Sequence, residues 1–214
     1  MLGTLWPKLG ATAAFTRVLS IVTALIQAGH QVTYAADERE NEGTTHLRAL
    51  GVECLRLAPN DSSFDLWVLG ARPNIAIMDR YATEEKFGWR LRAACPSCIR
   101  VLDSIDLHCL RIARGRAIGT TVDGLTAVAR LASDVLHREV AAIYRSDLTL
   151  VVSDFEWNFL VGECGVPATL LHLCRLSYPP RYQVVREFAG RCGNKLRRNL
   201  AKISGFNMRP VKWG

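Results

Sequence analysis

Residues 98–103 read Cys-Ile-Arg-Val-Leu-Asp, and residues 104–111 continue Ser-Ile-Asp-Leu-His-Cys-Leu-Arg. The first part is a short, largely apolar run with the length of a buried strand, whereas the second begins with polar residues and then becomes helical in pattern. Strands that are apolar throughout are typical of a parallel sheet covered on both faces. We therefore expect residues 98–102 to form a strand that ends at Asp103 and leads into a helix.

The same unit recurs on both sides of this stretch. Apolar runs with strand length alternate with helical patterns over about 175 residues, which predicts right-handed crossovers and a parallel sheet between two layers of helices. The sequence thus predicts an α/β domain of three layers with a mostly parallel sheet of six or seven strands. The other expected strands are 2–6, 32–36, 52–57, 74–78, 148–152 and 168–173, and the expected helices include 44–50, 61–70, 84–94 and one running to Gly162.

Three helix ends carry recognisable signals. Thr12 is a suitable N-terminal cap for a helix with apolar residues at helical spacing up to residue 26. Gly29 and Gly51 each stand where a helical pattern stops before a strand, which is the usual place of a C-terminal glycine.

The charge of the chain is concentrated at one end. The 214 residues carry a net charge of +7, yet residues 181–214 alone hold nine Lys or Arg and one acid. The rest is close to neutral, so a nucleic-acid-binding domain is not indicated, although a nucleic-acid role of the tail is a distant alternative. We expect a domain over 1–175 and a basic tail over 176–214, either an extension or disordered.

The composition also indicates the cellular compartment of the protein. No apolar run approaches the ~18 residues of a membrane span. The seven cysteines are odd in number and scattered, which favours a reducing, cytoplasmic setting. Cys95-Pro-Ser-Cys98 closes a helix and opens a strand, and no second pair exists, so neither a zinc site nor a redox pair is predicted.

Polar residues follow the predicted strands. The carboxyl ends of parallel strands meet at one edge of the sheet, where ligands of open α/β folds bind. His108 is the candidate general base, with Asp103 or Asp106 to orient its ring. The alternative is that both aspartates cap the following helix and that His108 pairs locally.

Two further segments are candidates at this edge. Arg80 directly follows a strand, and a guanidinium there suits a phosphate or carboxylate. The alternative is a helix capped by Thr83 with Glu84 and Glu85 in its first turn, which leaves Arg80 unexplained. Gly10 lies between the first strand and the first helix, where backbone N–H groups can approach a phosphate.

Taken together, several stretches resemble a bacterial-type group of glycosyltransferases with the GT-B architecture. Gly29-His-Gln-Val-Thr33 resembles the opening of such enzymes, and the match covers about residues 7–175. The stretches that carry it are 50–53, 60–65, 79–81, 84–90, 100–111, 139–148, 151–156 and 165–172.

The resemblance implies a Rossmann-like N-terminal domain that binds the acceptor and faces a second domain that binds a nucleotide-sugar donor. It implies sugar transfer to an unidentified acceptor without a bound metal or other cofactor. By position it carries over Gly10, Arg80, Ser153 and Glu156, to which we assign substrate binding. It also carries over Asp103, Asp106 and His108, to which we assign catalysis.

The resemblance fades after Leu173. The glutamate and glycine-rich loop that grip the donor in the family have no counterpart in this sequence, so we expect the chain alone to be incomplete as a catalyst. The alternatives are a non-catalytic acceptor-binding module that needs a separate donor-binding domain, or an inactive truncated product.

Overall fold

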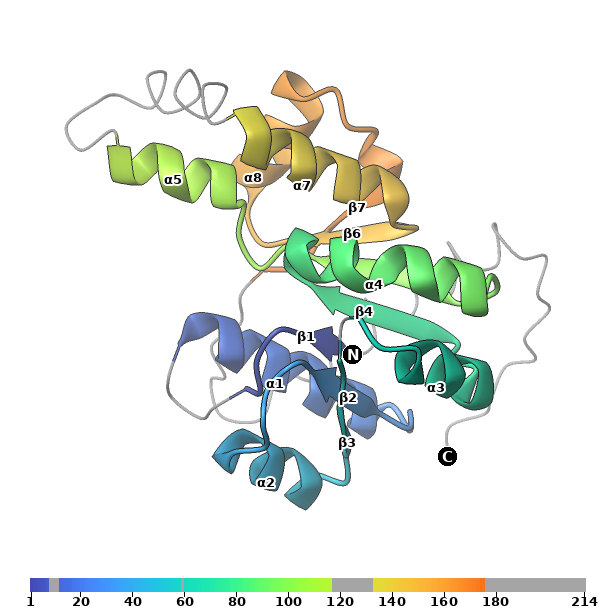
Figure 1. Cartoon of the computed structure of the whole chain (residues 1–214). Helices are drawn as coiled ribbons and strands as arrows, with labels where there is room; N and C mark the ends of the chain where they lie inside the picture. Colours follow the sequence, from blue (N-terminus) through green and yellow to red (C-terminus); the bar gives the residue numbers. More distant parts are fainter. Residues whose placement is uncertain (8–11, 59, 117–132, 176–214) are drawn as a thin grey trace, which may run out of the picture.

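The computed structural model describes residues 1–7, 12–58, 60–116 and 133–175 (Figure 1). These residues form one sheet of seven strands, all of them parallel, which confirms the predicted α/β fold. The order across the sheet is the third, second, first, fourth, fifth, sixth and seventh strand. The strands are β1 (Leu2–Gly3), β2 (Thr33–Ala36), β3 (Glu53–Arg56), β4 (Ile75–Asp79), β5 (Ile99–Asp103), β6 (Leu148–Val151) and β7 (Leu171–Leu173).

Helices occupy the connections between the strands. A π-helical turn, Phe159–Glu163, continues the last helix, and a 3-10 turn, Ala168–Leu170, precedes β7. The helices are α1 (Ala13–Gln27), α2 (Glu42–Ala49), α3 (Ser63–Ala71), α4 (Arg80–Ala94), α5 (His108–Arg116), α7 (Ser133–Arg145) and α8 (Asp154–Asn158).

The two glycine stops form as predicted. Gly29 and Gly51 have φ of +81°, the left-handed conformation that favours glycine. After α1, the N–H of Gly29 donates to the carbonyl of Ile26, and the N–H of His30 donates to that of Leu25. The glycine and the residue after it close α2 in the same way. Thr12 caps α1 as expected, since its hydroxyl accepts the N–H of Phe15 at 3.2 Å.

Alternation along the strands divides the core between two faces of the sheet. Ile21 of α1 packs with Ile77, Val101 and Leu148 on one face. Phe87 and Leu91 of α4 pack with Ala76 and Met78 on the other. α7 lies beside α4 on that second face (Figure 1), which gives the three layers that the periodicity predicts.

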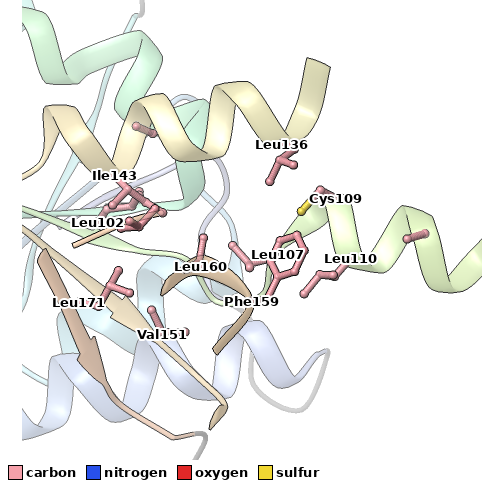
Figure 2. Packing of buried hydrophobic residues seen from close by; sticks show 13 residues of the cluster. Leu102, Leu107, Cys109, Leu110, Leu136, Ile143, Val151, Phe159, Leu160 and Leu171 are labelled. Atoms are coloured by element: carbon pink, nitrogen blue, oxygen red, sulfur yellow. The ribbon is translucent and has the colours of Figure 1, made fainter. Parts of the chain in front are cut away.

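The largest cluster of buried residues lies around β5, β6 and β7. Leu102, Val151 and Leu171 from the sheet meet Ile143 of α7 and Leu160 of the π-helical turn (Figure 2). Leu107 and Leu110 anchor the start of α5 in the same cluster, so this helix is positioned by apolar burial from the sheet side.

Three predicted boundaries differ from the structure by three or four residues. The first strand comprises only Leu2–Gly3, although Trp6 beyond it is fully buried and donates its backbone N–H to Glu38 at 2.9 Å. The last strand is 171–173, because residues 168–170 form the 3-10 turn. α4 begins at Arg80 rather than Glu84, so Thr83 is a buried residue inside the helix and not its cap.

Candidate functional site

The order in which strands are added to the sheet reverses between β1 and β4. The chain runs outward from β1 through β2 to β3 and then returns to place β4 on the other side of β1. Ligands of open α/β sheets bind outside the carboxyl ends of the strands at such a point. The predicted Gly10 loop follows β1 here but lies outside the described residues, as does the basic tail.

Asp79 and Asp103 stand side by side at this edge. They are the last residues of β4 and β5 and face each other in the register of the two strands. Asp79 is 7% exposed, and its Oδ1 has no hydrogen-bond partner; Nε of Arg80 is 3.6 Å away. Burial raises the pKa of Asp79 to about 6, Arg80 opposes the shift, and Asp103 and Asp106 add to it.

Asp103 is bound to a residue of the first helix. Nε of Arg17 donates to both carboxylate oxygens at 2.8 and 2.9 Å, and both side chains are buried. Nη1 of Arg17 donates to the carbonyl of Cys174 at 2.7 Å, so one guanidinium joins α1, β5 and the chain after β7. Asp103 is therefore a strong structural anchor of the edge.

The backbone is strained just beyond both strands. Arg80 has φ of +66° and Ile105 has φ of +59°, and neither is a glycine. The left-handed region is a clear outlier for a β-branched residue such as Ile105. Each such residue costs on the order of 1–3 kcal/mol, and this kind of strain clusters at functional sites.

His108 opens α5 and lies against the segment that follows β4. Its ring meets Tyr81 edge-on, with centroids 5.4 Å apart and an angle of 79° between the planes. Nδ1 is buried without a hydrogen-bond partner, and its nearest charged contact is Oε1 of Glu139 at 3.7 Å. Asp103 binds Arg17, and Oδ2 of Asp106 lies 3.4 Å from Nε of Arg111. The expected role of either aspartate in orienting the His108 ring stays a prediction.

The N-terminus of α5 is capped from other helices. Glu139 of α7 accepts the N–H of His108 and of Cys109 at 2.6 and 3.1 Å, and Glu156 of α8 accepts the N–H of Leu107 at 3.0 Å. The aspartates of the preceding loop do not provide this cap. A carboxylate is favoured there because the exposed N–H groups of a helix end carry partial positive charge.

Glu156 and Ser153 form a local pair at the start of α8. The hydroxyl of Ser153 accepts the N–H of Glu156 at 3.2 Å and caps the helix. Glu156 is 3% exposed, its Oε2 has no hydrogen-bond partner, and burial raises its pKa. Both predicted binding residues are thus part of the local scaffold.

Sequence reasoning missed Arg17 and Glu139. The signal that could have found Glu139 is its place on an amphipathic helix, because it shares the buried face with Leu136 and Ile143, three residues before and four after it. A carboxylate on such a face requires a partner. The same reasoning applies to Arg17 beside the buried Val18 and Ile21.

Two hollows lie near these residues. A cavity of about 10 Å³ is lined by Tyr81, Ser104, Leu107 and Glu139 together with Leu102 and Ile143, and it is close to the minimum that holds one water molecule. A wider cleft of about 330 Å³ lies by β7, between Asp154, Trp157, Asn158, His172 and Leu173.

Within the part of the chain that the structure describes, no group of three or more His, Cys, Asp or Glu side chains is placed to hold a metal ion. In the same residues no helix combines the length and the apolar character that crossing a bilayer requires. Comparisons with protein-family models, with curated proteins and with solved structures each find no match.

Proposed function

We propose that this domain is the acceptor-side half of a GT-B glycosyltransferase and that it binds a hydroxyl-rich acceptor at the carboxyl edge of β4–β6. The seven-stranded parallel sheet agrees with the Rossmann-like domain that the sequence resemblance implies. The resemblance supplies the reaction class, and the residues at the edge supply the chemistry.

One observation carries the proposal. Buried polar atoms in folded proteins almost always have hydrogen-bond partners. Four such atoms without one gather at this single edge: Oδ1 of Asp79, Nε of Arg80, Nδ1 of His108 and Oε2 of Glu156. Together with the strained Arg80 and Ile105, these buried atoms mark a pre-organised polar edge. Its partly exposed side chains, Arg80 and His108, are the groups that would meet a ligand with several hydroxyl groups.

The roles follow from the chemistry of each group. His108 takes the proton of the acceptor hydroxyl as its oxygen bonds to the anomeric carbon of the donor sugar, while the bond from that carbon to the nucleotide diphosphate breaks. Arg80 provides a guanidinium for a phosphate or carboxylate of the ligand. Asp106, two residues before His108 in the loop that leads into α5, adds negative charge beside the base.

The test is a binding experiment on the ¹⁵N-labelled chain. We expect methyl glycosides or sugar phosphates to shift backbone amide signals in residues 79–81 and 104–108, and uridine and guanosine diphosphate sugars to shift them little. Arg80→Ala and His108→Ala should each remove the response, whereas Arg48→Ala, in an exposed ion pair with Glu40, should keep it. Shifts confined to other parts of the chain, or binding of nucleotide sugars alone, would contradict the proposal.

A further inference from the structure

The carboxylate of Glu139 lies between the start of α5 and the ring of His108. Its Oε1 accepts the backbone N–H of His108 at 2.6 Å and its Oε2 accepts that of Cys109 at 3.1 Å. The same Oε1 lies 3.7 Å from Nδ1 of the ring, and Glu139 is only 4% exposed. Because both oxygens are bound by backbone donors, the carboxylate cannot turn away from the imidazole.

The other contacts of the His108 imidazole leave one of its two nitrogens for a ligand. Tyr81 holds the ring edge-on, and the guanidinium of Arg138 lies over the Tyr81 ring, 4.9 Å from its centroid. The side chain of His108 is 18% exposed, and Nδ1 is buried on the side of Glu139. Nε2 is therefore the nitrogen through which His108 reaches an acceptor.

The geometry points to Glu139 as the positioning residue of His108, an inference that rests on His108 being the base of the proposed transferase site. A carboxylate fixed at this place favours the tautomer with the proton on Nδ1 and keeps Nε2 free to take the acceptor proton. It also stabilises the imidazolium that results. A gap of 3.7 Å is compatible with this role, because catalytic hydrogen bonds are often long before the ligand is bound.

The groups around Glu139 make its arrangement with His108 sensitive to pH. The titratable groups that face it are His108 and Cys109 of α5, Asp106 of the preceding loop, Glu156 of α8 and Tyr81 of α4. Burial raises the pKa of Glu139 to about 7, the hydrogen bonds with Cys109 lower it, and Asp106 and Glu156 raise it. Because Oε1 of Glu139 lies 3.7 Å from Nδ1 of His108, we expect the two groups to titrate as a coupled pair.

The experiment follows the imidazole directly and needs no ligand. Long-range ¹H–¹⁵N spectra of the whole chain report the tautomer and the pKa of His108, and ¹³C spectra of the carboxyl carbon report Glu139. We expect the Nδ1–H tautomer and a coupled, two-step titration in the native protein. Glu139→Gln should lower the pKa of His108 by about one unit, a tenfold change in proton affinity, as loss of an opposite charge at this range does.

Two further variants serve as comparisons in this test. Glu139→Asp retains the charge and should hold the pKa of His108 closer to the native value than Glu139→Gln does. Glu40→Gln, in the loop before α2 and in an exposed pair with Arg48, should leave it unchanged. An Nε2–H tautomer with independent titrations in the native protein, or an unchanged pKa in folded Glu139→Gln, would overturn the inference even if sugars bind. Failure of the sugar-binding test with these titrations as expected would remove only the proposed function.

Discussion

Nε of Arg17 lies 2.8 Å from Oδ1 and 2.9 Å from Oδ2 of Asp103, in a place where neither side chain is more than 4% exposed. The pair joins the first helix to β5, and a further hydrogen bond from the guanidinium to the carbonyl of Cys174 holds the chain after the last strand. Three parts of the sequence that lie far apart thus meet at one cation.

Removing the guanidinium of Arg17 alone should therefore destabilise the protein strongly. Arg17→Ala leaves the carboxylate of Asp103 buried without its partner, and we expect a loss of about 3–5 kcal/mol in the free energy of unfolding. Denaturant unfolding measures it. The double variant Arg17→Met, Asp103→Leu replaces both charges by apolar groups and should recover part of the loss.

Arg48→Ala is the matched control, because Arg48 pairs with Glu40 at an exposed position. Exposed pairs contribute little, so this variant should unfold close to the native midpoint. Equal losses for Arg17→Ala and Arg48→Ala would show that the buried pair is not an anchor.

Asp79 should make the stability of the protein fall as the pH rises. Burial raises its pKa from 3.8 to about 6 in the folded state. Between these values the folded protein binds more protons than the unfolded chain, so the free energy of unfolding decreases with pH across this window and levels off above it. Asp79→Asn cannot ionise and lacks this decrease.

We therefore expect Asp79→Asn to be more stable than the native protein at pH 8, by on the order of 1–3 kcal/mol, and about equally stable at pH 3.5. Unfolding curves at several pH values check it. Asp154→Asn provides the opposite case, because Arg175 lowers the pKa of the exposed Asp154. A benefit of Asp79→Asn that is the same at all pH values would contradict the burial of a charge.

Catalysis provides a separate prediction. In the family that the sequence resembles, the second domain holds the nucleotide sugar, and positioning of the donor supplies much of the rate. We expect negligible transfer by residues 1–214 alone and measurable transfer when a matching donor-binding domain is added. His108→Ala should then reduce the rate by about 100-fold or more, and Cys95→Ser should reduce it far less. Restored transfer that survives His108→Ala would remove the assignment of the base.

The features that the sequence predicted are those with local causes. β5 ends at Asp103 as expected because a largely apolar run stops there, and Gly29 ends α1 because the left-handed conformation suits glycine. Apolar periodicity and turn chemistry are written within a few neighbouring residues, so they can be recognised without knowledge of the tertiary structure.

The features that were missed depend on distant partners. Arg17 and Asp103 are separated by 86 positions, and Glu139 caps a helix whose first residue, His108, lies 31 positions before it. A buried charge is stable only with such a partner. The start of α4 was misplaced for a related reason, because Arg80 adopts a positive φ that its own residue type does not favour.

Replacement of Gly88 should destabilise the protein although it lies in the middle of a helix. A Cβ at this position would come within 2.5 Å of Oε1 of Glu84, one turn earlier in α4. That carboxylate has little room to move, because Glu84 is 2% exposed and Nε of Arg145 donates to its two oxygens at 3.1 and 2.9 Å. The gain in helix propensity from alanine, about 1 kcal/mol, is thus opposed by overpacking of a fixed ion pair.

We expect Gly88→Ala to lower the free energy of unfolding by about 1–3 kcal/mol, as overpacked sites do. Gly70→Ala, in α3 with no atom within 4 Å of the added Cβ, should be neutral or slightly stabilising. Glu84→Ala removes the obstacle, so the double variant with Gly88→Ala should lose less than the two single losses combined, because residues in contact are not additive. If Gly88→Ala is as harmless as Gly70→Ala, the Glu84 carboxylate is free to move and α4 and α7 are not locked together by its pair with Arg145.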